Sequence, residues 1–269
     1  MTKNESKEPS VGELFDLTGK RALITGASGY LGGAMSRALA EAGATVVASS
    51  RDLSRAQSVA ASLPATGGAS HQAVRLDHMD EASMDEGFSR AIELAGDLDI
   101  LVNNGHDPLA NDLTNVTDEQ FTRQLANATG YFHLARLLHG HAVERGAAAS
   151  VIMLGSMYGL VGSYPKAYQD VCPASPVAYH ALKGGIIHLT RHLAVYWARD
   201  KVRVNCLSPG PFPPPRISPE LVHRLCDHSP VGRMGLPHEL KGAVVYLASD
   251  ASSYMTGQNI VIDGGWTAW

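Results

Sequence analysis

The chain has 269 residues, of which 45% are hydrophobic and 18% charged, and its formal net charge is −4 at pH 7. The length fits one α/β domain, and the apolar fraction supplies a full core but is too low for a membrane protein. No apolar run approaches the ~20 residues of a membrane-spanning helix, and the absence of a basic block argues against a nucleic-acid partner. Three scattered cysteines without a Cys-x-x-Cys pair predict reduced thiols in a cytoplasmic protein, with neither a disulfide framework nor a zinc site.

The N-terminal segment is polar and lacks the apolar core of a signal peptide. We expect residues 1–16 to form a flexible tail. Residues 17–269 show no domain boundary and no internal repeat, so a single domain is predicted there.

A strand, a glycine-rich turn, a helix and a second strand come first in this domain. Lys20–Thr25 has the pattern of a short buried strand, and Ala44–Ser49 that of another. Between them lie Gly26, Gly29 and Gly32, followed by a helical pattern that Gly43 ends. Glycines in such a βαβ unit allow a tight turn and close backbone approach to a pyrophosphate at the helix N-terminus.

The alternation of strands and helices continues to the C-terminus. Strands are predicted at residues 71–76, 98–103, 150–154, 202–206 and 259–263, and helices at 80–94, 118–144, 179–199 and 238–248. This order predicts an α/β fold with one doubly wound, Rossmann-type parallel sheet and helices on both faces. Ligands of such sheets bind beyond the carboxyl ends of the strands. Gly26, Asp77, Asn103, Ser156 and Pro209 fall at or just beyond those ends.

Tyr179 and Lys183 lie four residues apart in a helical stretch and therefore share one helix face. An ammonium beside a phenol stabilises the phenolate, so a group with an ordinary pKa near ~10 exchanges protons closer to neutral pH. Such a phenol donates a proton to a carbonyl oxygen or accepts one from an alcohol. The spacing by itself is common, and a helix that merely carries both residues is the alternative.

With these motifs in place, residues 17–266 resemble the short-chain dehydrogenase/reductase family. The resemblance rests on the glycine turn after Thr25, Asp77, Asn103-Asn104-Gly105, Asn127, Gly155-Ser156, the Tyr179/Lys183 pair, Ser208-Pro209-Gly210 and Asp263-Gly264-Gly265. It implies a general acid/base (Tyr179), a lysine that lowers its pKa and holds the nicotinamide ribose (Lys183), a serine that orients the substrate oxygen (Ser156), and an asparagine that supports a proton path (Asn127). The cofactor contacts that it implies are Thr25, Gly26, Ser28, Gly29, Tyr30, Leu31, Gly32, Ser50, Arg51, Asp77, Asn103, Gly105, Tyr179, Lys183, Pro209 and Gly210. It implies no metal.

Three features depart from the family pattern. The glycine spacing is that of the longer, extended subfamily, although the chain length and the C-terminal half are classical. The usual Asn-Asn-Ala-Gly is Asn103-Asn104-Gly105-His106, and His106 is either a substrate contact or a tolerated loop residue. Residues 158–176 lengthen the segment between Ser156 and Tyr179, and we expect them to wall the substrate pocket; a surface insertion is the alternative.

The cofactor preference depends on the end of the second strand. An acidic residue there favours NAD, whereas an arginine accommodates the 2′-phosphate of NADP. Ser50 occupies the acidic position and Arg51 follows it, which favours NADP(H) over NAD(H). Asp52 weakens this interpretation, because it is able to pair with Arg51 or to repel the phosphate.

The resemblance implies an NAD(P)-dependent oxidoreductase that interconverts a carbonyl and a secondary alcohol. A sugar-derived or polyol substrate is the first interpretation, and a 3-oxoacyl thioester is the second. A nucleotide-binding sensor or scaffold without catalysis is the alternative of another class. The presence of Asn127, Ser156, Tyr179 and Lys183 favours the enzyme. We expect the helices at 118–144 and 179–199 of one copy to pack against those of another copy and so form a homo-oligomer, a dimer or a tetramer. Our prediction is a homotetramer.

Overall fold

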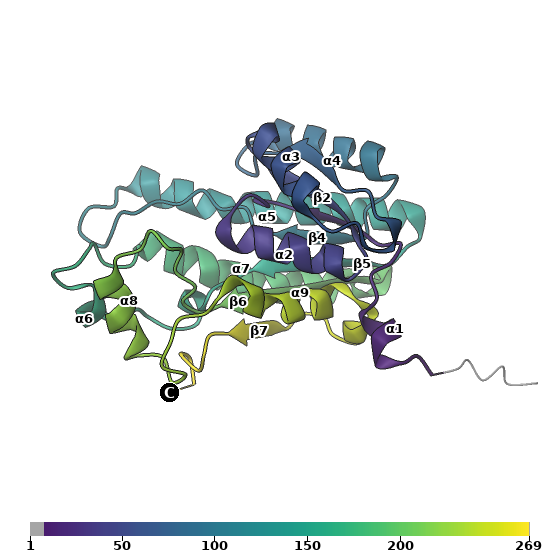
Figure 1. Cartoon of the computed structure of the whole chain (residues 1–269). Coiled ribbons are helices and arrows are strands. Elements are labelled where there is room, and N and C mark those ends of the chain that lie inside the picture. Colours follow the sequence, from purple (N-terminus) through teal and green to yellow (C-terminus); the bar gives the residue numbers. More distant parts are fainter. Residues whose placement is uncertain (1–7, 269) are drawn as a thin grey trace, which may run out of the picture.

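One parallel sheet forms the centre of the molecule (Figure 1). A computed structural model describes residues 8–268. The seven strands lie in the order β3-β2-β1-β4-β5-β6-β7, which confirms the predicted doubly wound fold. The strands are β1 (Arg21–Ile24), β2 (Thr45–Ser50), β3 (Gln72–Arg75), β4 (Ile100–Asn103), β5 (Ala149–Leu154), β6 (Val202–Pro209) and β7 (Asn259–Ile262). The order reverses between β1 and β4, so the ligand crevice is expected beyond their carboxyl ends.

Helices cover both faces of this sheet (Figure 1). One core cluster packs α4 (Glu81–Ala95), α5 (Asp118–Arg145) and α7 (Val177–Trp197) against the strands. The other packs α2 (Tyr30–Glu41), α3 (Leu53–Ser62) and α9 (Lys241–Ala248) against the opposite face. Successive strand residues alternate between the clusters: Leu101 faces the first, and Ile100 and Val102 face the second. Burial on both faces explains why the strands are continuous apolar runs.

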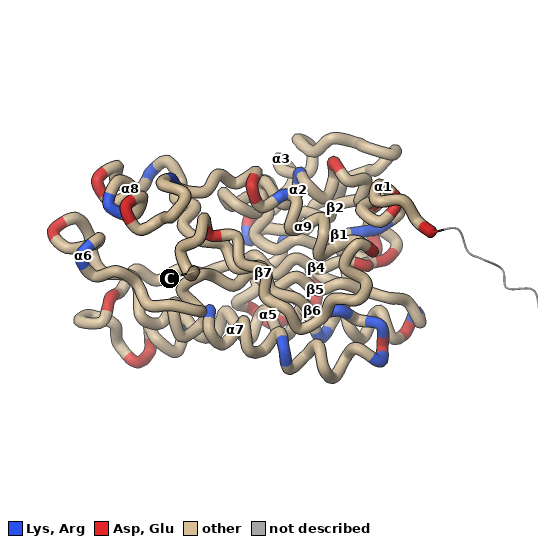
Figure 2. The backbone as a smooth tube through the Cα atoms, turned by 90° about the horizontal axis from the view of Figure 1, so that it is seen from below, with Lys and Arg blue, Asp and Glu red and all other residues tan. Residues whose placement is uncertain are grey.

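A third, smaller core cluster lies away from the sheet and joins segments that are distant in the sequence. Here α6 (Pro165–Tyr168) and α8 (Pro219–Cys226) lie side by side at one end of the molecule (Figures 1 and 2). Met157, Leu221, Leu225 and Trp266 are buried between them. The chain also has short 3₁₀ turns, η1 (Thr66–Gly68), η2 (Met157–Gly159), η3 (Ala198–Asp200), η4 (Pro237–Leu240) and η5 (Asp250–Ser252).

The N-terminal segment, which was predicted to be a tail, contains a short helix. Helix α1 (Val11–Phe15) begins at a capping box, in which Ser10 Oγ accepts from the backbone of Glu13 and the Glu13 carboxylate accepts from the backbone of Ser10. Phe15 then packs near Tyr246, with ring centroids 6.1 Å apart. Residues 11–15 of the predicted tail are helical, and Ser10 and Glu13 form the Ser-x-x-Glu signature of a helix start. Residues 1–7 of the predicted tail lie outside the described residues.

Three further helices, α3, α6 and α8, were not predicted from the sequence. Asp52 begins α3 by accepting hydrogen bonds from the backbone of Ser54 and Arg55, and α8 starts at Pro219.

Charged residues of both signs interleave along the backbone (Figure 2). Within residues 8–268, no helix combines the length and the hydropathy that crossing a membrane requires.

Candidate active site

The glycine turn after β1 adopts a conformation that only glycine accommodates at two positions. Gly26 has a positive φ of 63°, and a side chain there would press on Gly105. A Cβ on Gly32 would lie 2.2 Å from the Gly26 carbonyl oxygen. Gly29 is the N-cap of α2, so the first amides of that helix have no intrahelical acceptor. Free amides at a helix N-terminus over a closely packed turn fit a pyrophosphate.

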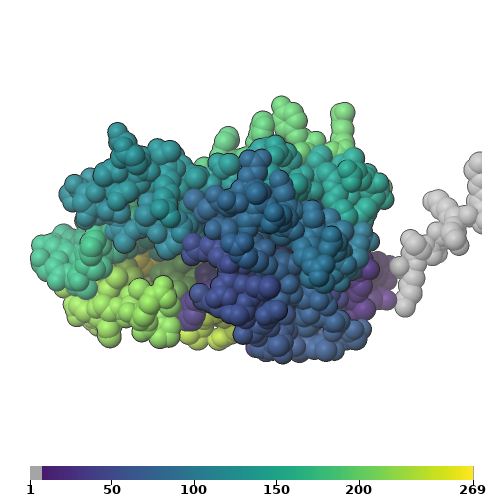
Figure 3. All heavy atoms as spheres, turned by 90° about the horizontal axis from the view of Figure 1, so that it is seen from above, coloured from purple at the N-terminus to yellow at the C-terminus, as the bar shows by residue number. Residues whose placement is uncertain are grey.

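A cleft of about 770 Å³ opens over this turn. Figure 3 shows the surface hollowed between the purple N-terminal segments and the green segment that precedes and includes α8. Its walls include ten of the predicted cofactor contacts: Thr25, Gly26, Ser28, Gly29, Tyr30, Leu31, Gly32, Ser50, Arg51 and Gly105. Arg55 and Arg216 add two further guanidinium groups, so the cleft is suited to a polyanionic ligand.

A smaller cavity of about 240 Å³ adjoins the cleft and holds the predicted catalytic residues. Ser156 follows β5 by two residues, and Tyr179 and Lys183 lie in the first turns of α7. Pro209 and Gly210, at the end of β6, complete the predicted residues on its walls. Four residues line both the cavity and the cleft: Leu31, Asn104, His106 and Phe212. The cleft and the cavity that holds Tyr179 therefore adjoin each other.

The electrostatics around Tyr179 differ in one respect from the expectation. Burial raises the pKa of Tyr179, and a hydrogen bond from Ser156 only partly opposes this. Burial also lowers the pKa of Lys183 to about 8. Lys183 Nζ donates to the Leu154 carbonyl at 2.6 Å and lies 5.6 Å from the centroid of the Tyr179 ring. The expected lowering of the phenol pKa is not found in this geometry, because burial raises the pKa of Tyr179 and the Ser156 hydrogen bond, not the ammonium, is what opposes the rise.

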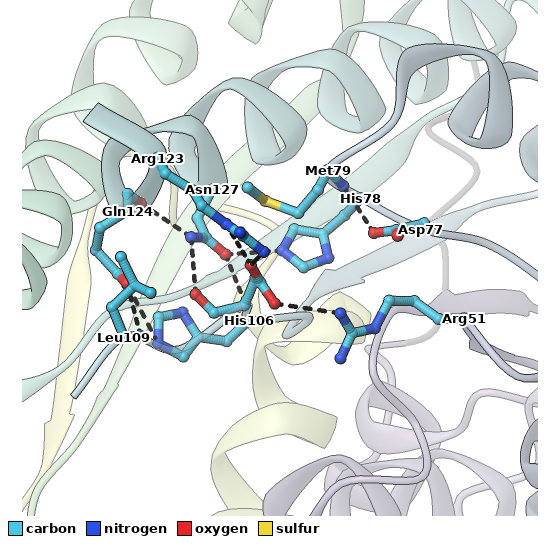
Figure 4. A network of polar contacts seen from close by, with 10 residues as sticks. Arg51, Asp77, His78, Met79, His106, Leu109, Arg123, Gln124 and Asn127 are labelled. Atoms are coloured by element: carbon cyan, nitrogen blue, oxygen red, sulfur yellow. Dashed lines mark hydrogen bonds and ion pairs between the residues drawn. The ribbon is translucent and has the colours of Figure 1, made fainter. Parts of the chain in front are cut away.

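Asn127 lies behind the cavity rather than on its wall, in the polar network of Figure 4. Its Oδ1 accepts from His78 Nε2 and from the backbone of Asp107, both at 2.8 Å. Its Nδ2 donates to the Gln124 carbonyl at 2.9 Å. These bonds occupy the side chain, so Asn127 holds the loop that follows β4 in place. Its part in a proton path remains a prediction.

Two predicted cofactor contacts also lie apart from the cleft and the cavity. Asp77 turns back on its own loop and accepts from the backbone of Met79, while its neighbours Leu76 and His78 line the cleft. Asn103 is fully buried, and its amide donates to the Tyr131 carbonyl at 2.9 Å. The residue that reaches the cleft is Asn104, the next in the chain. This placement does not support direct contacts from Asp77 or Asn103.

Sequence reasoning missed the polar residues that support this loop. Asp107 bridges Arg51 and Arg123 at 3.1 and 2.8 Å, and Gln124 is buried beside His106. His78 approaches Gly105 so closely that a Cβ there would lie 2.9 Å from His78 Nδ1. That contact explains why glycine stands at position 105 and not at 106. The signal in the sequence was the Asp-His pair after β3 together with the shifted glycine.

The insertion at 158–176 packs against α8 and the C-terminal segment and contributes no residue to the lining of the cavity around Tyr179. Tyr164 stacks on His228 with centroids 3.9 Å apart and meets Trp266 edge-on. Tyr158 stacks on His180, next to Tyr179 in α7. The insertion thus lies behind the segment that carries Phe212 and supports it. The insertion does not form the wall of the cavity around Tyr179, as was expected from the sequence.

Comparison with known proteins agrees with this geometry. Residues 26–267 match a family model described as "Enoyl-(Acyl carrier protein) reductase". A crystal structure of a short-chain type dehydrogenase/reductase from Mycobacterium marinum is 36% identical, with a TM-score of 0.86 over 97% of this chain and 100% of that one. The chain belongs to the short-chain dehydrogenase/reductase family. Its glycine spacing, which pointed to the extended subfamily, therefore occurs in a chain of classical length.

Other members of the family resemble this chain over nearly its whole length. Sorbose reductase sou1 from Schizosaccharomyces pombe is 33% identical, covering 94% of this chain and 98% of the relative. Galactitol 2-dehydrogenase (L-tagatose-forming) from Cereibacter sphaeroides is 34% identical, covering 95% and 98%. The structure of a gluconate 5-dehydrogenase from Burkholderia cenocepacia in complex with NADP and tartrate is 29% identical, with a TM-score of 0.85 over 97% and 100%.

This short-chain dehydrogenase/reductase is an NAD(P)-dependent oxidoreductase that interconverts a carbonyl and a secondary alcohol. When bound, the nicotinamide supplies or accepts the hydride. A phenol in the position of Tyr179 is able to hold the proton that passes to or from a substrate oxygen, and Ser156 hydrogen-bonds that phenol. Lys183 places a cationic group beside the same ring. Burial of these groups among Leu154, Pro209 and Phe212 excludes water and strengthens their electrostatic interactions.

Proposed function

We propose that the enzyme reduces a ketose or a related polyhydroxy ketone to a polyol with NADPH, and catalyses the reverse oxidation. The observation that carries this proposal is the small cavity at Tyr179, which opens directly into a cleft that carries three guanidinium groups. The relatives named for sorbose and galactitol match this chain almost from end to end. A 3-oxoacyl thioester remains the alternative substrate.

The test is NADPH oxidation by the purified protein against three substrate classes. These are 2-ketoses such as sorbose, fructose and tagatose, an acetoacetyl thioester, and simple diketones. We expect turnover of at least one ketose with a kcat/KM that exceeds those of the other two classes by ~10-fold or more, which corresponds to ~1.4 kcal/mol of transition-state discrimination. Preferred turnover of the thioester would replace the proposal with its alternative. NADPH binding without any turnover would favour a non-catalytic, nucleotide-binding role.

The preference for NADP(H) rests on the charges at the adenosine end of the cleft. Arg51, Arg55 and Arg216 line it together with a single acid, Asp52. The Asp52 carboxylate is engaged as the N-cap of α3 and does not pair with Arg51. Arg51 instead donates to Asp107, which Arg123 also binds. Because Arg123 still pairs with Asp107 when Arg51 turns away, Arg51 is available for a 2′-phosphate at low cost.

Arg51→Ala should therefore weaken NADPH binding by ~10- to 100-fold, the range expected for a lost charge-assisted hydrogen bond. The dissociation constant for NADH should change by less than ~2-fold, since a 2′-hydroxyl does not need the guanidinium. Fluorescence titration of both cofactors measures the two constants. Arg37→Ala is the matched control, because Arg37 is exposed on α2 and away from the cleft lining. Equal weakening of NADPH and NADH by Arg51→Ala would refute the preference.

We also propose a homotetramer that forms through α5 and α7. These helices expose Phe132, Val143, Val195 and Tyr196, the last two at 76% and 69% of their full exposure. Large apolar side chains on neighbouring helix faces are typical of interaction surfaces. Light scattering at micromolar concentration measures the mass directly, and a monomer would contradict this assembly.

The cytoplasmic location stays a prediction that rests on three unpaired cysteines.

A further inference from the structure

His106 stands at the junction of the cofactor cleft and the cavity of Tyr179 and lines both. Its ring meets the Tyr179 ring edge-on, with centroids 5.4 Å apart and an interplanar angle of 74°. No role for this side chain follows from the acid/base chemistry assigned to Tyr179. Its position, however, places it on the cavity wall beside the Tyr179 ring.

The hydrogen bonds around Gln124 determine which nitrogen of His106 carries the proton (Figure 4). The backbone N–H of Leu109 meets one end of the Gln124 amide at 3.0 Å, and a backbone N–H only donates, so that end is Oε1. The amide nitrogen therefore faces His106 Nε2 at 3.4 Å. Because an amide nitrogen also only donates, Nε2 of His106 is the acceptor and the proton lies on Nδ1.

The Nδ1–H group remains free to bind a ligand. Within residues 8–268 it has no hydrogen-bond partner, and it is not among the fully buried polar atoms that lack one, so it keeps accessible surface. Burial lowers the pKa of His106 to about 3, helped by the positive charge of Lys183 and by His78, while Asp107 acts in the opposite direction. The ring is therefore a neutral donor at any working pH.

The other polar side chains of the cavity already make hydrogen bonds within the chain. Lys183 donates to the Leu154 carbonyl, and Ser156 Oγ accepts from the backbone of Tyr158. The Asn104 amide nitrogen donates to the carbonyls of Thr25 and Gly26, which holds the glycine turn. The Nδ1–H of His106, by contrast, makes no hydrogen bond to the described residues and has no part in the proton transfer.

We propose that His106 binds the substrate through Nδ1–H, by donating to a hydroxyl oxygen on the carbon next to the reacting carbonyl. This inference rests on the proposed function, because it identifies the part of a polyhydroxy substrate that the site recognises. Gln124 is a positioning residue in this scheme, since it fixes the tautomer and the ring orientation. The specificity for polyhydroxy over simple ketones then depends on one neutral hydrogen bond.

The test compares two ketones of equal size, 1,3-dihydroxyacetone and pentan-3-one, which differ only in hydroxyl or methyl groups beside the carbonyl. The variant His106→Phe keeps a ring against Tyr179 but has no donor. We expect its kcat/KM to fall ~10- to 100-fold for dihydroxyacetone and to change less than ~2-fold for pentan-3-one, as expected for one lost hydrogen bond to a substrate hydroxyl. His106→Asn places an amide near the Nδ1 position and should keep most of the dihydroxyacetone activity.

Each remaining outcome contradicts the inference. Equal losses of activity for both ketones in His106→Phe would mean that the ring only shapes the cavity. If fluorescence titration of His106→Phe shows a loss of NADPH affinity that accounts for the whole fall in kcat/KM, then His106 binds the cofactor and not the substrate. A wild-type group that titrates near pH 6.5 in kcat/KM and disappears in His106→Phe would show a charged, acid/base histidine. If the wild type reduces no polyhydroxy ketone, the proposed substrate class is overturned. That outcome is distinct from one in which the wild type is active but the role of His106 is contradicted.

Discussion

Tyr179→Phe should reduce kcat by ~10²- to 10⁴-fold, the range that a positioned acid or base contributes. The phenol lines the cavity and is able to exchange a proton with a substrate oxygen, and phenylalanine fills the same half-buried position on α7. NADPH affinity should change by less than ~2-fold, because the cleft that holds the nucleotide has its own lining. Steady-state kinetics and fluorescence titration measure the two effects.

The pH dependence follows from the direction of the Tyr179 pKa. Burial raises it, so the phenol is protonated over the neutral range and is ready to donate to a carbonyl in the reduction. Oxidation of an alcohol requires the phenolate, so its rate should increase with pH into the alkaline range while reduction is favoured at lower pH. A Tyr179→Phe variant with more than a tenth of the wild-type kcat, or an oxidation rate highest at acidic pH, would contradict the assignment.

Much of the fold was predictable because both faces of the sheet are covered by helices. All seven strands were located within a few residues, since a strand buried on both faces is an uninterrupted apolar run. The exceptions are instructive. Strand β6 continues to Pro209 because that residue still pairs with Ile262 of β7, although proline usually ends a strand. Helices α1 and α8 have only five and eight residues, so neither offers a long periodic pattern.

The candidate site was predictable where the chemistry requires a particular residue type. Gly26, Gly32, Ser156, Tyr179 and Lys183 all line the cleft or the cavity. The supporting network was not predictable, because it depends on pairs that are distant in the sequence. Nothing local links Arg51 to Asp107, or His106 to Gln124, until the sheet brings β2, β4 and α5 together.

The direction of the Tyr179 pKa also depends on the folded environment. Burial is a property of the folded chain, and helical spacing alone contains no information about it. Lys183 is 4% exposed and Tyr179 lies at the back of the same cavity. The spacing correctly predicted that the two groups share a helix face, but the local dielectric environment decides the size and sign of the effect.

Lys183→Met should abolish turnover and, at the same time, stabilise the fold. Burial lowers the pKa of Lys183 to about 8 from an ordinary value of 10.5, which means that the folded protein holds the charged form at a cost. An apolar side chain of similar length removes that cost. At pH 7 we expect the free energy of unfolding to rise by on the order of 1–3 kcal/mol, after allowance for the hydrogen bond to the Leu154 carbonyl that is lost.

The pH dependence of stability separates this explanation from a general packing effect. Between pH 8 and 10.5 the unfolded chain binds more protons at this lysine than the folded chain does, so wild-type stability gains from rising pH in that window. The advantage of Lys183→Met should therefore be largest below pH 8 and should decrease toward pH 10. Urea denaturation at pH 7 and pH 9.5 measures the difference, with Lys166→Met, at an exposed lysine of α6, as the control. An advantage that is equal at both pH values, or a destabilised variant, would mean that the buried ammonium carries no such cost. A stabilised, inactive variant would instead show that the enzyme sacrifices stability to keep a cation beside its acid/base.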